Sequence, residues 1–111
     1  MTPEERDEIR DKLVREIADT RQTIERLEEL TQPIAPDNAI GRLSRMEALN
    51  SRSVNEAALT AALQRLPRLE NALDRIDRPD FGACRKCRAP IPVGRLRFLP
   101  EAELCVACSR R

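Results

Sequence analysis

Aromatic residues and histidine are nearly absent from this sequence. Its 111 residues include two Phe and no Trp, Tyr or His. Because aromatic side chains bury the largest area per residue, the chain cannot fill a large globular core. It also lacks histidine for acid–base chemistry and a glycine-rich phosphate loop, so we expect no enzyme.

Long apolar segments are absent as well. No apolar run approaches the roughly 18 residues of a membrane span, and no cationic and then apolar segment opens the chain. We therefore expect a cytoplasmic protein that makes no membrane contact.

Charged residues are abundant, at 35% of the chain, and they are unevenly distributed. Residues 81–111 carry seven basic and two acidic side chains, a net charge of +5. Residues 1–80 carry 13 basic and 17 acidic side chains, a net charge of −4. The C-terminal segment is thus electrostatically distinct from the rest.

Helix-forming residues dominate the first part of the chain. The expected first helix begins at the sequence TPEE, with Thr2 as the N-cap and Pro3 at the first helical position, and ends near Thr31. One narrow apolar stripe follows this charged helix, so a partner helix is required to cover it. The stripe consists of Ile9, Leu13, Ile17, Ile24, Leu27 and Leu30, with Thr20 at one seam position.

A second helix is expected to begin at an N-cap on Asp37 or Asn38 and to end near Asp77. Apolar residues recur along it at roughly heptad spacing, and alanines near residue 60 would allow a close approach of helices. Its predicted seam is Ile40, Leu43, Met46, Val54, Ala57, Ala61, Leu66, Leu69, Leu73 and Ile76.

The sequence QPIAPDNAIG, residues 32–41, separates the two helices with two prolines and one glycine. A short connection between long helices implies antiparallel neighbours. We predict a mainly α fold, with a long antiparallel coiled-coil hairpin over residues 1–78 and its tip at about residues 32–41. A small C-terminal zinc module over residues 79–111 follows. Since the second helix covers the stripe of the first, we expect a monomer.

Pro67 interrupts the second helical pattern and is expected to kink the helix. Counted back through the tip, Pro67 should lie opposite the N-terminus of the first helix, which would place the kink at the base of the hairpin. A kink without any role is the alternative.

The four cysteines form two Cys-x-x-Cys pairs, CRKC and CVAC, with 17 residues between them. In this pattern each turn offers two thiolates to one tetrahedral zinc ion. A disulfide framework fits an intracellular chain poorly, and a redox pair needs a strand–helix scaffold. An iron–sulfur cluster is a further alternative. We predict one structural zinc ion bound by Cys84, Cys87, Cys105 and Cys108.

The segment PDFGACRKCRAPIPVGRLRFLPEAELCVAC, residues 79–108, resembles the zinc finger of the DksA/TraR family of bacterial transcription regulators. The resemblance rests on Phe-Gly before the first cysteine, on Ile-Pro and Arg-Leu between the pairs, and on Pro100 before the second pair. The preceding helical hairpin is similar to this family in architecture.

This resemblance implies a regulator that binds RNA polymerase directly and does not bind DNA sequence-specifically. The hairpin would enter the secondary channel so that its tip approaches the catalytic centre, with the zinc module and hairpin base on the channel rim. The candidate tip residues are Asp37, Asn38, Arg42, Ser44, Arg45 and Met46. The candidate rim residues are Arg68, Arg95 and Arg97, of which only Arg68 matches a family position.

The sequence departs from the family in two places. The best-known members carry Asp-x-x-Asp-x-Ala at the tip, where an ungapped count puts Gly41, Ser44 and Met46; Asp37 lies four residues earlier. The sequence also stops three residues after Cys108, whereas longer members continue into a helix that contributes to a guanosine tetraphosphate site. We therefore do not expect that nucleotide to bind.

Two other functions stay open on the sequence alone. The basic C-terminal segment is compatible with a nucleic-acid-binding zinc module, although Phe81 and Phe98 are expected in its core, where they could not stack on bases. A zinc-stabilised adaptor between proteins is the other alternative.

Overall fold

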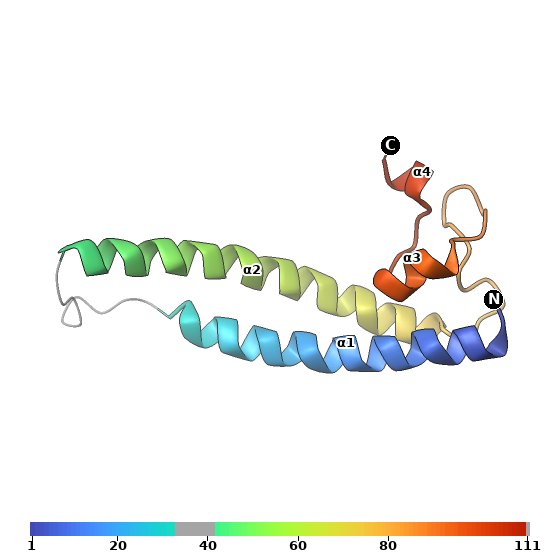
Figure 1. Ribbon diagram of the computed structural model, residues 1–111, viewed down its shortest axis with the longest axis horizontal. Helices are drawn as coiled ribbons and strands as arrows, with labels where there is room; N and C mark the ends of the chain where they lie inside the picture. Colours follow the sequence, from blue (N-terminus) through green and yellow to red (C-terminus); the bar gives the residue numbers. More distant parts are fainter. Residues whose placement is uncertain (33–41, 111) are drawn as a thin grey trace. The chain divides into compact units, whose positions relative to one another are not determined.

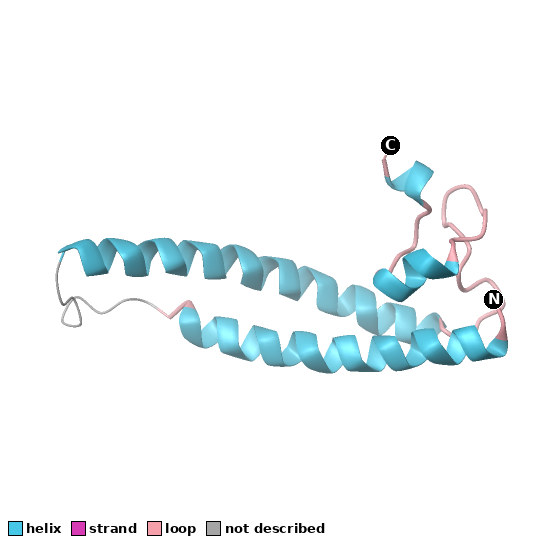
Figure 2. Cartoon of the chain, viewed as in Figure 1, coloured by secondary structure: helices cyan, strands magenta, loops and turns pink. Residues whose placement is uncertain are grey.

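The computed structural model describes residues 1–32 and 42–110, and this part of the chain is mainly helical (Figures 1 and 2). The helices are α1 (Pro3–Leu30), α2 (Arg42–Arg75), α3 (Val93–Phe98) and α4 (Val106–Ser109). Extended pairing among the described residues is limited to one bridge between Ala83 and Pro90. Apart from Gln32, the expected tip lies outside the described residues.

The chain divides into two compact units. The first contains Met1–Ala18 and Pro67–Arg111, and the second contains Asp19–Leu66. The boundary expected between residues 78 and 79 therefore falls inside the first unit, which holds the end of α2 and all four cysteines. None of the described helices has the length and apolar character that crossing a membrane requires.

The first helix begins as the sequence predicts. The backbone N–H of Glu5 donates to Thr2 Oγ1 at 3.1 Å, and the backbone N–H of Thr2 donates to Glu5 Oε1 at 2.8 Å. These reciprocal bonds form a capping box, which satisfies two backbone donors at the helix start. The bond from the Thr2 backbone also lowers the pKa of Glu5.

The predicted stripe on α1 is confirmed over five turns. All its members from residue 9 to residue 27 are buried, and Ile9 and Leu13 are completely inaccessible. Thr20, the polar member of the stripe, is buried as well. The exception is Leu30 at the end of the helix, which is 52% exposed.

Among the side chains that the structure describes, which exclude those of Ile40 and Leu43, the predicted seam on α2 is correct only in the C-terminal part of the helix. Leu69 and Ile76 are buried, but Met46, Val54, Ala57 and Ala61 are exposed. From residue 59 onward, buried and half-buried positions follow another heptad phase, with Ala72 buried beside it; the members of this phase are Leu59, Ala62, Leu66, Leu69, Leu73 and Ile76. At Ala57 and Ala61 the error follows from the small side chain, which leaves little apolar surface to water on either face of a helix. Met46 and Val54 were misplaced because the heptad spacing was counted in the wrong phase.

In the first unit, the start of α1 lies against the end of α2 and the turn that follows it. The Arg6 guanidinium donates to the carbonyls of Ile76 and Arg78, and Arg10 forms an ion pair with Asp77. The two helix segments are therefore antiparallel here. The expectation that Pro67 lies opposite the N-terminus is wrong, since residues 76–78 occupy that place, and α2 continues as helix through Pro67.

In the second unit, the same two helices are again antiparallel. Arg52 Nε, on α2, donates to the carbonyl oxygen of Thr31 immediately after α1, at 3.2 Å. The N-terminal half of α2 thus lies beside the C-terminal end of α1. Together the two units confirm the helical hairpin.

Replacing a leucine on each face of α2 tests the corrected seam. Leu69→Ala is expected to lower the free energy of unfolding by about 2 to 5 kcal/mol, because Leu69 is fully buried. Leu63→Ala, at a side chain 51% exposed, is the matched control and should change it by less than about 0.5 kcal/mol. Urea denaturation followed by circular dichroism measures both, and equal losses would contradict the assignment.

Candidate metal centre

A tight turn presents the first pair of cysteines. The Cys84 backbone N–H donates to the carbonyl of Ala89 at 2.8 Å, and the Arg88 N–H donates to the carbonyl of Cys84 at 2.9 Å. Arg88 has a φ of 67°, which closes the turn in the left-handed region. This places Cys84 in the interior and Cys87 at the surface.

Gly82, two residues before Cys84, gives the backbone the conformation that leads into this turn. Its φ of 93° is one that residues with a side chain rarely adopt, and an added Cβ would lie 3.0 Å from Cε of Met1. The Gly82 carbonyl accepts a hydrogen bond from the Ile91 N–H at 2.7 Å, which ties the two sides of the turn together.

The second pair of cysteines lies at the start of a short helix. Cys105 is the N-cap of α4, and its carbonyl accepts a hydrogen bond from the Ser109 N–H at 2.9 Å. Cys108 lies on α4 and is 6% exposed. As in the first pair, one cysteine is buried and the other is more accessible.

The four sulfur atoms fit one tetrahedral zinc ion. All four Sγ atoms lie within 4.8 Å of one another. The Sγ atoms of Cys87 and Cys105, which come from different turns, are 3.7 Å apart. Zinc–sulfur bonds of about 2.3 Å in a tetrahedron place sulfurs about 3.8 Å apart. The site therefore holds a structural zinc ion, as the sequence predicts, and four protein ligands leave no position for a substrate.

The electrostatics of the thiols also favours a cation. Hydrogen bonds from the backbone N–H groups of Cys87 and Cys105 lower the pKa of Cys84 to about 5. The backbone N–H of Cys108 likewise lowers the pKa of Cys105. Contacts with the other three thiols, that of Cys105 first, raise the pKa of Cys108 to about 12. The crowded sulfurs resist a full set of four negative charges, and a divalent cation would offset two of them.

A carboxylate that the sequence analysis did not single out links the two turns. Glu103, two residues before Cys105, pairs with Arg75 at the end of α2 and with Arg85 beside Cys84, both at 3.2 Å. The Glu103 backbone carbonyl also accepts the Arg85 N–H at 2.8 Å. In the sequence, Glu103 is distinguished only by its charge, as one of two acidic residues in a basic segment.

The structure brings two of the three candidate rim residues to one hollow. Arg68 and Arg95 line a hollow of about 510 Å³ in the first unit, together with Arg85, Glu101 and Glu103. Arg68 is exposed. Arg95 Nε donates to the carbonyl of Leu104 at 3.1 Å, so it also supports the backbone leading into Cys105.

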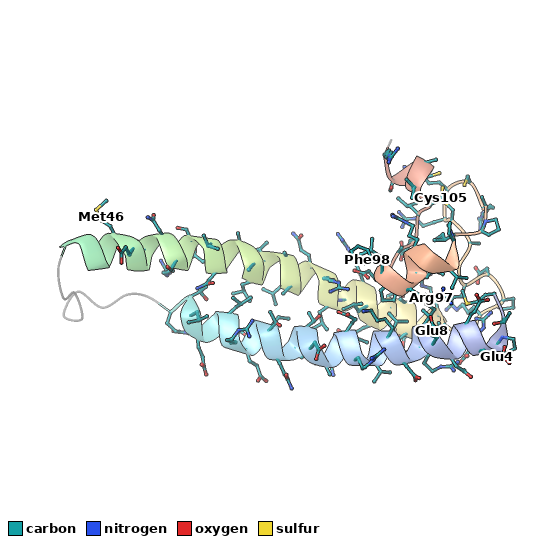
Figure 3. The ribbon with its side chains drawn as sticks, viewed as in Figure 1. Glu4, Glu8, Met46, Arg97, Phe98 and Cys105 are labelled. Atoms are coloured by element: carbon teal, nitrogen blue, oxygen red, sulfur yellow. The ribbon has the colours of Figure 1, made fainter. Side chains whose placement is uncertain are left out.

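The third candidate rim residue lies elsewhere in the first unit. Arg97, on α3, pairs with Glu8 of α1, and both residues are labelled in Figure 3. This bond raises the pKa of Arg97. The pairing was not foreseen, because 88 residues separate the two side chains in the sequence.

The candidate tip residues are only partly described. Asp37 and Asn38 lie outside the described residues. Arg42, Ser44 and Arg45 belong to the first turns of α2, and Met46 is 56% exposed there.

One expectation for the C-terminal segment is wrong. Phe81 is buried, as expected, but Phe98 at the end of α3 is 78% exposed (Figure 3). Leu96 and Pro100, on either side of it in the sequence, take the interior positions instead.

Comparison with protein families finds a match to the metal centre. A family profile described as "Prokaryotic dksA/traR C4-type zinc finger" matches residues 79–111. The curated relatives named "RNA polymerase-binding transcription factor DksA" from Salmonella typhimurium and Escherichia coli are 35% identical over 43 residues. These matches span 39% of this chain and only 28% of the relatives' length.

Comparison with solved structures extends the similarity to the whole chain. The structure of transcription factor DksA2 from Pseudomonas aeruginosa matches with a TM-score of 0.72 and 26% sequence identity. This match covers 100% of the present chain and 84% of the other. The likeness therefore includes the helical hairpin as well as the zinc module.

Natively purified protein is expected to contain one zinc ion per chain. Elemental analysis measures this, and either no zinc or iron in its place would contradict the assignment. Cys84→Ser is expected to abolish binding, whereas Ser109→Ala, which changes a hydroxyl beside Cys108 that is not a ligand, should leave the zinc content unchanged.

Acidification is expected to release the zinc ion. Because the ligands are thiolates, protons compete with the metal, so occupancy is high at neutral pH and falls as the pH falls. Release should become complete in acid, where all four ligands, including Cys84 with its lowered pKa, take up protons. A chromogenic chelator added from pH 8 to pH 4 follows the release, and a pH-independent occupancy would contradict it.

Proposed function

We propose, from the premise that residues 79–111 are a zinc finger of the DksA/TraR family, that this chain is a transcription regulator that binds RNA polymerase directly. The observation that carries the proposal is the likeness to transcription factor DksA2, which extends over the entire chain. A zinc module alone would be compatible with many partners. The additional long antiparallel hairpin is what separates this architecture from other small zinc proteins.

In this proposal the protein acts by contact in the cytoplasm and has no catalytic function. The hairpin tip enters the secondary channel of the polymerase and approaches the catalytic centre, while the zinc module and the hairpin base rest on the channel rim. The closed four-cysteine site supports a structural role for the metal, since it has no open coordination position.

The rim contact that we propose is the hollow lined by Arg68 and Arg95. Exposed guanidinium groups suit carboxylates on a partner, because Arg presents several donors in a planar fork. Arg68 is the stronger candidate, since Arg95 already bonds the Leu104 carbonyl. Arg97 is left out of the proposed contact, because Glu8 neutralises it.

The internal pairing of basic residues also weighs against a nucleic-acid interface. Of the seven basic residues that give residues 81–111 their positive charge, Arg85, Arg95 and Arg97 bind groups within the protein.

One observation favours nucleic-acid binding, because exposed Phe98 is an aromatic side chain that could stack on a base. A gel shift with single-stranded and duplex DNA, with Phe98→Ala as the variant, tests that reading.

Binding to polymerase should depend on Arg68. Arg68→Ala is expected to weaken binding about tenfold, roughly the effect of losing one well-placed interface residue. Arg26→Ala removes the same charge from an exposed position on α1 in the other unit and is the matched control. A pull-down with purified polymerase, quantified by titration, measures both. Equal affinities for the two variants would contradict the proposed rim contact.

The tip should control the transcriptional outcome rather than binding. Asp37→Asn is expected to change transcription by purified polymerase while affinity stays the same. Asparagine keeps the size of the side chain and removes only its negative charge, which would act on bound cations. Unchanged transcription would leave Asp37 without a role at the tip. The proposed tip contact would then move to Arg42, Ser44 and Arg45.

A further inference from the structure

The C-terminal end of α1 has an unfavourable charge. Its last turn contains Glu28 and Glu29 and no basic residue. The C-terminal end of a helix carries partial negative charge from its free carbonyl groups, so two carboxylates there destabilise it. Leu30, which ends the helix, is half exposed and adds little burial.

Thr31 and Gln32, which follow the helix, donate hydrogen bonds to two of the carbonyl groups at this end. Thr31 Oγ1 donates to the carbonyl of Leu27 at 2.8 Å, and Gln32 Nε2 donates to the carbonyl of Glu28 at 3.1 Å. Both donors are neutral, so they bond carbonyl groups without supplying the missing positive charge.

A charged hydrogen-bond donor comes from the other helix of the second unit. Arg52 Nε donates to the carbonyl oxygen of Thr31 at 3.2 Å. Its guanidinium is also held by Glu56, one turn further along α2, at 3.1 Å. The Arg52 side chain is 33% exposed, so it is partly shielded from water. Arg52 lies seven residues before Leu59 and therefore has the heptad register of a seam residue.

We infer that Arg52 is a positioning residue that caps α1 from the neighbouring helix and fixes where the chain leaves α1 toward the hairpin turn. It takes a seam position because the contact needed there is with a carbonyl and not with an apolar side chain. The consequence for transcription rests on the proposed function, whereas the cap itself does not.

Amide hydrogen exchange tests the cap directly. Arg52→Met keeps the length of the side chain but removes the donor and the charge. We expect the Thr31 and Gln32 amides, which bond the Leu27 and Glu29 carbonyls, to exchange about two- to fivefold faster, as expected when one charge–dipole contact at a helix end is lost. Amides of residues 9–17 should not change.

Glu56→Gln is the matched control, because it removes the ion pair but leaves the Arg52 donor in place. It should produce clearly less acceleration than Arg52→Met. Equal exchange in Arg52→Met and the unaltered protein would overturn the inference. So would an acceleration in Glu56→Gln as large as that in Arg52→Met, since the ion pair would then be the stabilising contact.

A second measurement separates this inference from the proposed function. Arg52→Met is expected to retain its affinity for polymerase and to lose at least half of its effect on transcription. A fall in affinity together with the effect would overturn the positioning role in transcription. If the unaltered protein does not bind polymerase, the proposed function fails, and the exchange experiment still decides whether Arg52 caps α1.

Discussion

The need to bring four sulfur atoms to one point governs the first compact unit. Cys84 and Cys108 are 24 residues apart, and the segment between them has few large apolar side chains with which to form a core. The metal ion holds this segment in its folded conformation, because so short a segment cannot bury enough apolar surface to do so. Ion pairs reinforce the metal site, because Glu103 joins Arg75 of α2 to Arg85 beside the first cysteine.

The zinc module is not built separately from the helices. Phe81, Ile91 and Leu96 are buried in the same compact unit as Ile9 and Ile76. Polar contacts reinforce this arrangement, since Arg6 bonds carbonyls just after α2 and Glu8 pairs with Arg97 of α3. A boundary drawn from composition at residue 78 therefore divides a unit that burial and ion pairs hold together.

The sequence predicted those features that depend on residue spacing alone. The cysteine pairs, the Thr2 cap and the α1 stripe follow from local patterns, and the structure agrees with each. The seam of α2 and the position of Phe98 could not be found this way. Alanines near residue 60 fit two helix faces equally well, and Phe98 competes for the interior with Leu96 and Pro100, which only the folded arrangement decides. Pairings such as that of Glu8 with Arg97 have no local signal.

The difference between what a local pattern shows and what the folded arrangement decides applies to charge as well. Counting residues gives the C-terminal segment a net charge of +5, which suggests a surface for nucleic acid. In the structure several of these charges are paired internally, because Arg85, Arg95 and Arg97 each bond a carboxylate or carbonyl of the protein itself. Two exposed guanidinium groups line the hollow: that of Arg85 is paired with Glu103, and that of Arg68 belongs to α2, outside the basic segment. Which cations are available to a partner is thus determined by internal pairing, and this favours a protein surface that meets a few placed charges over a polyanion that requires many.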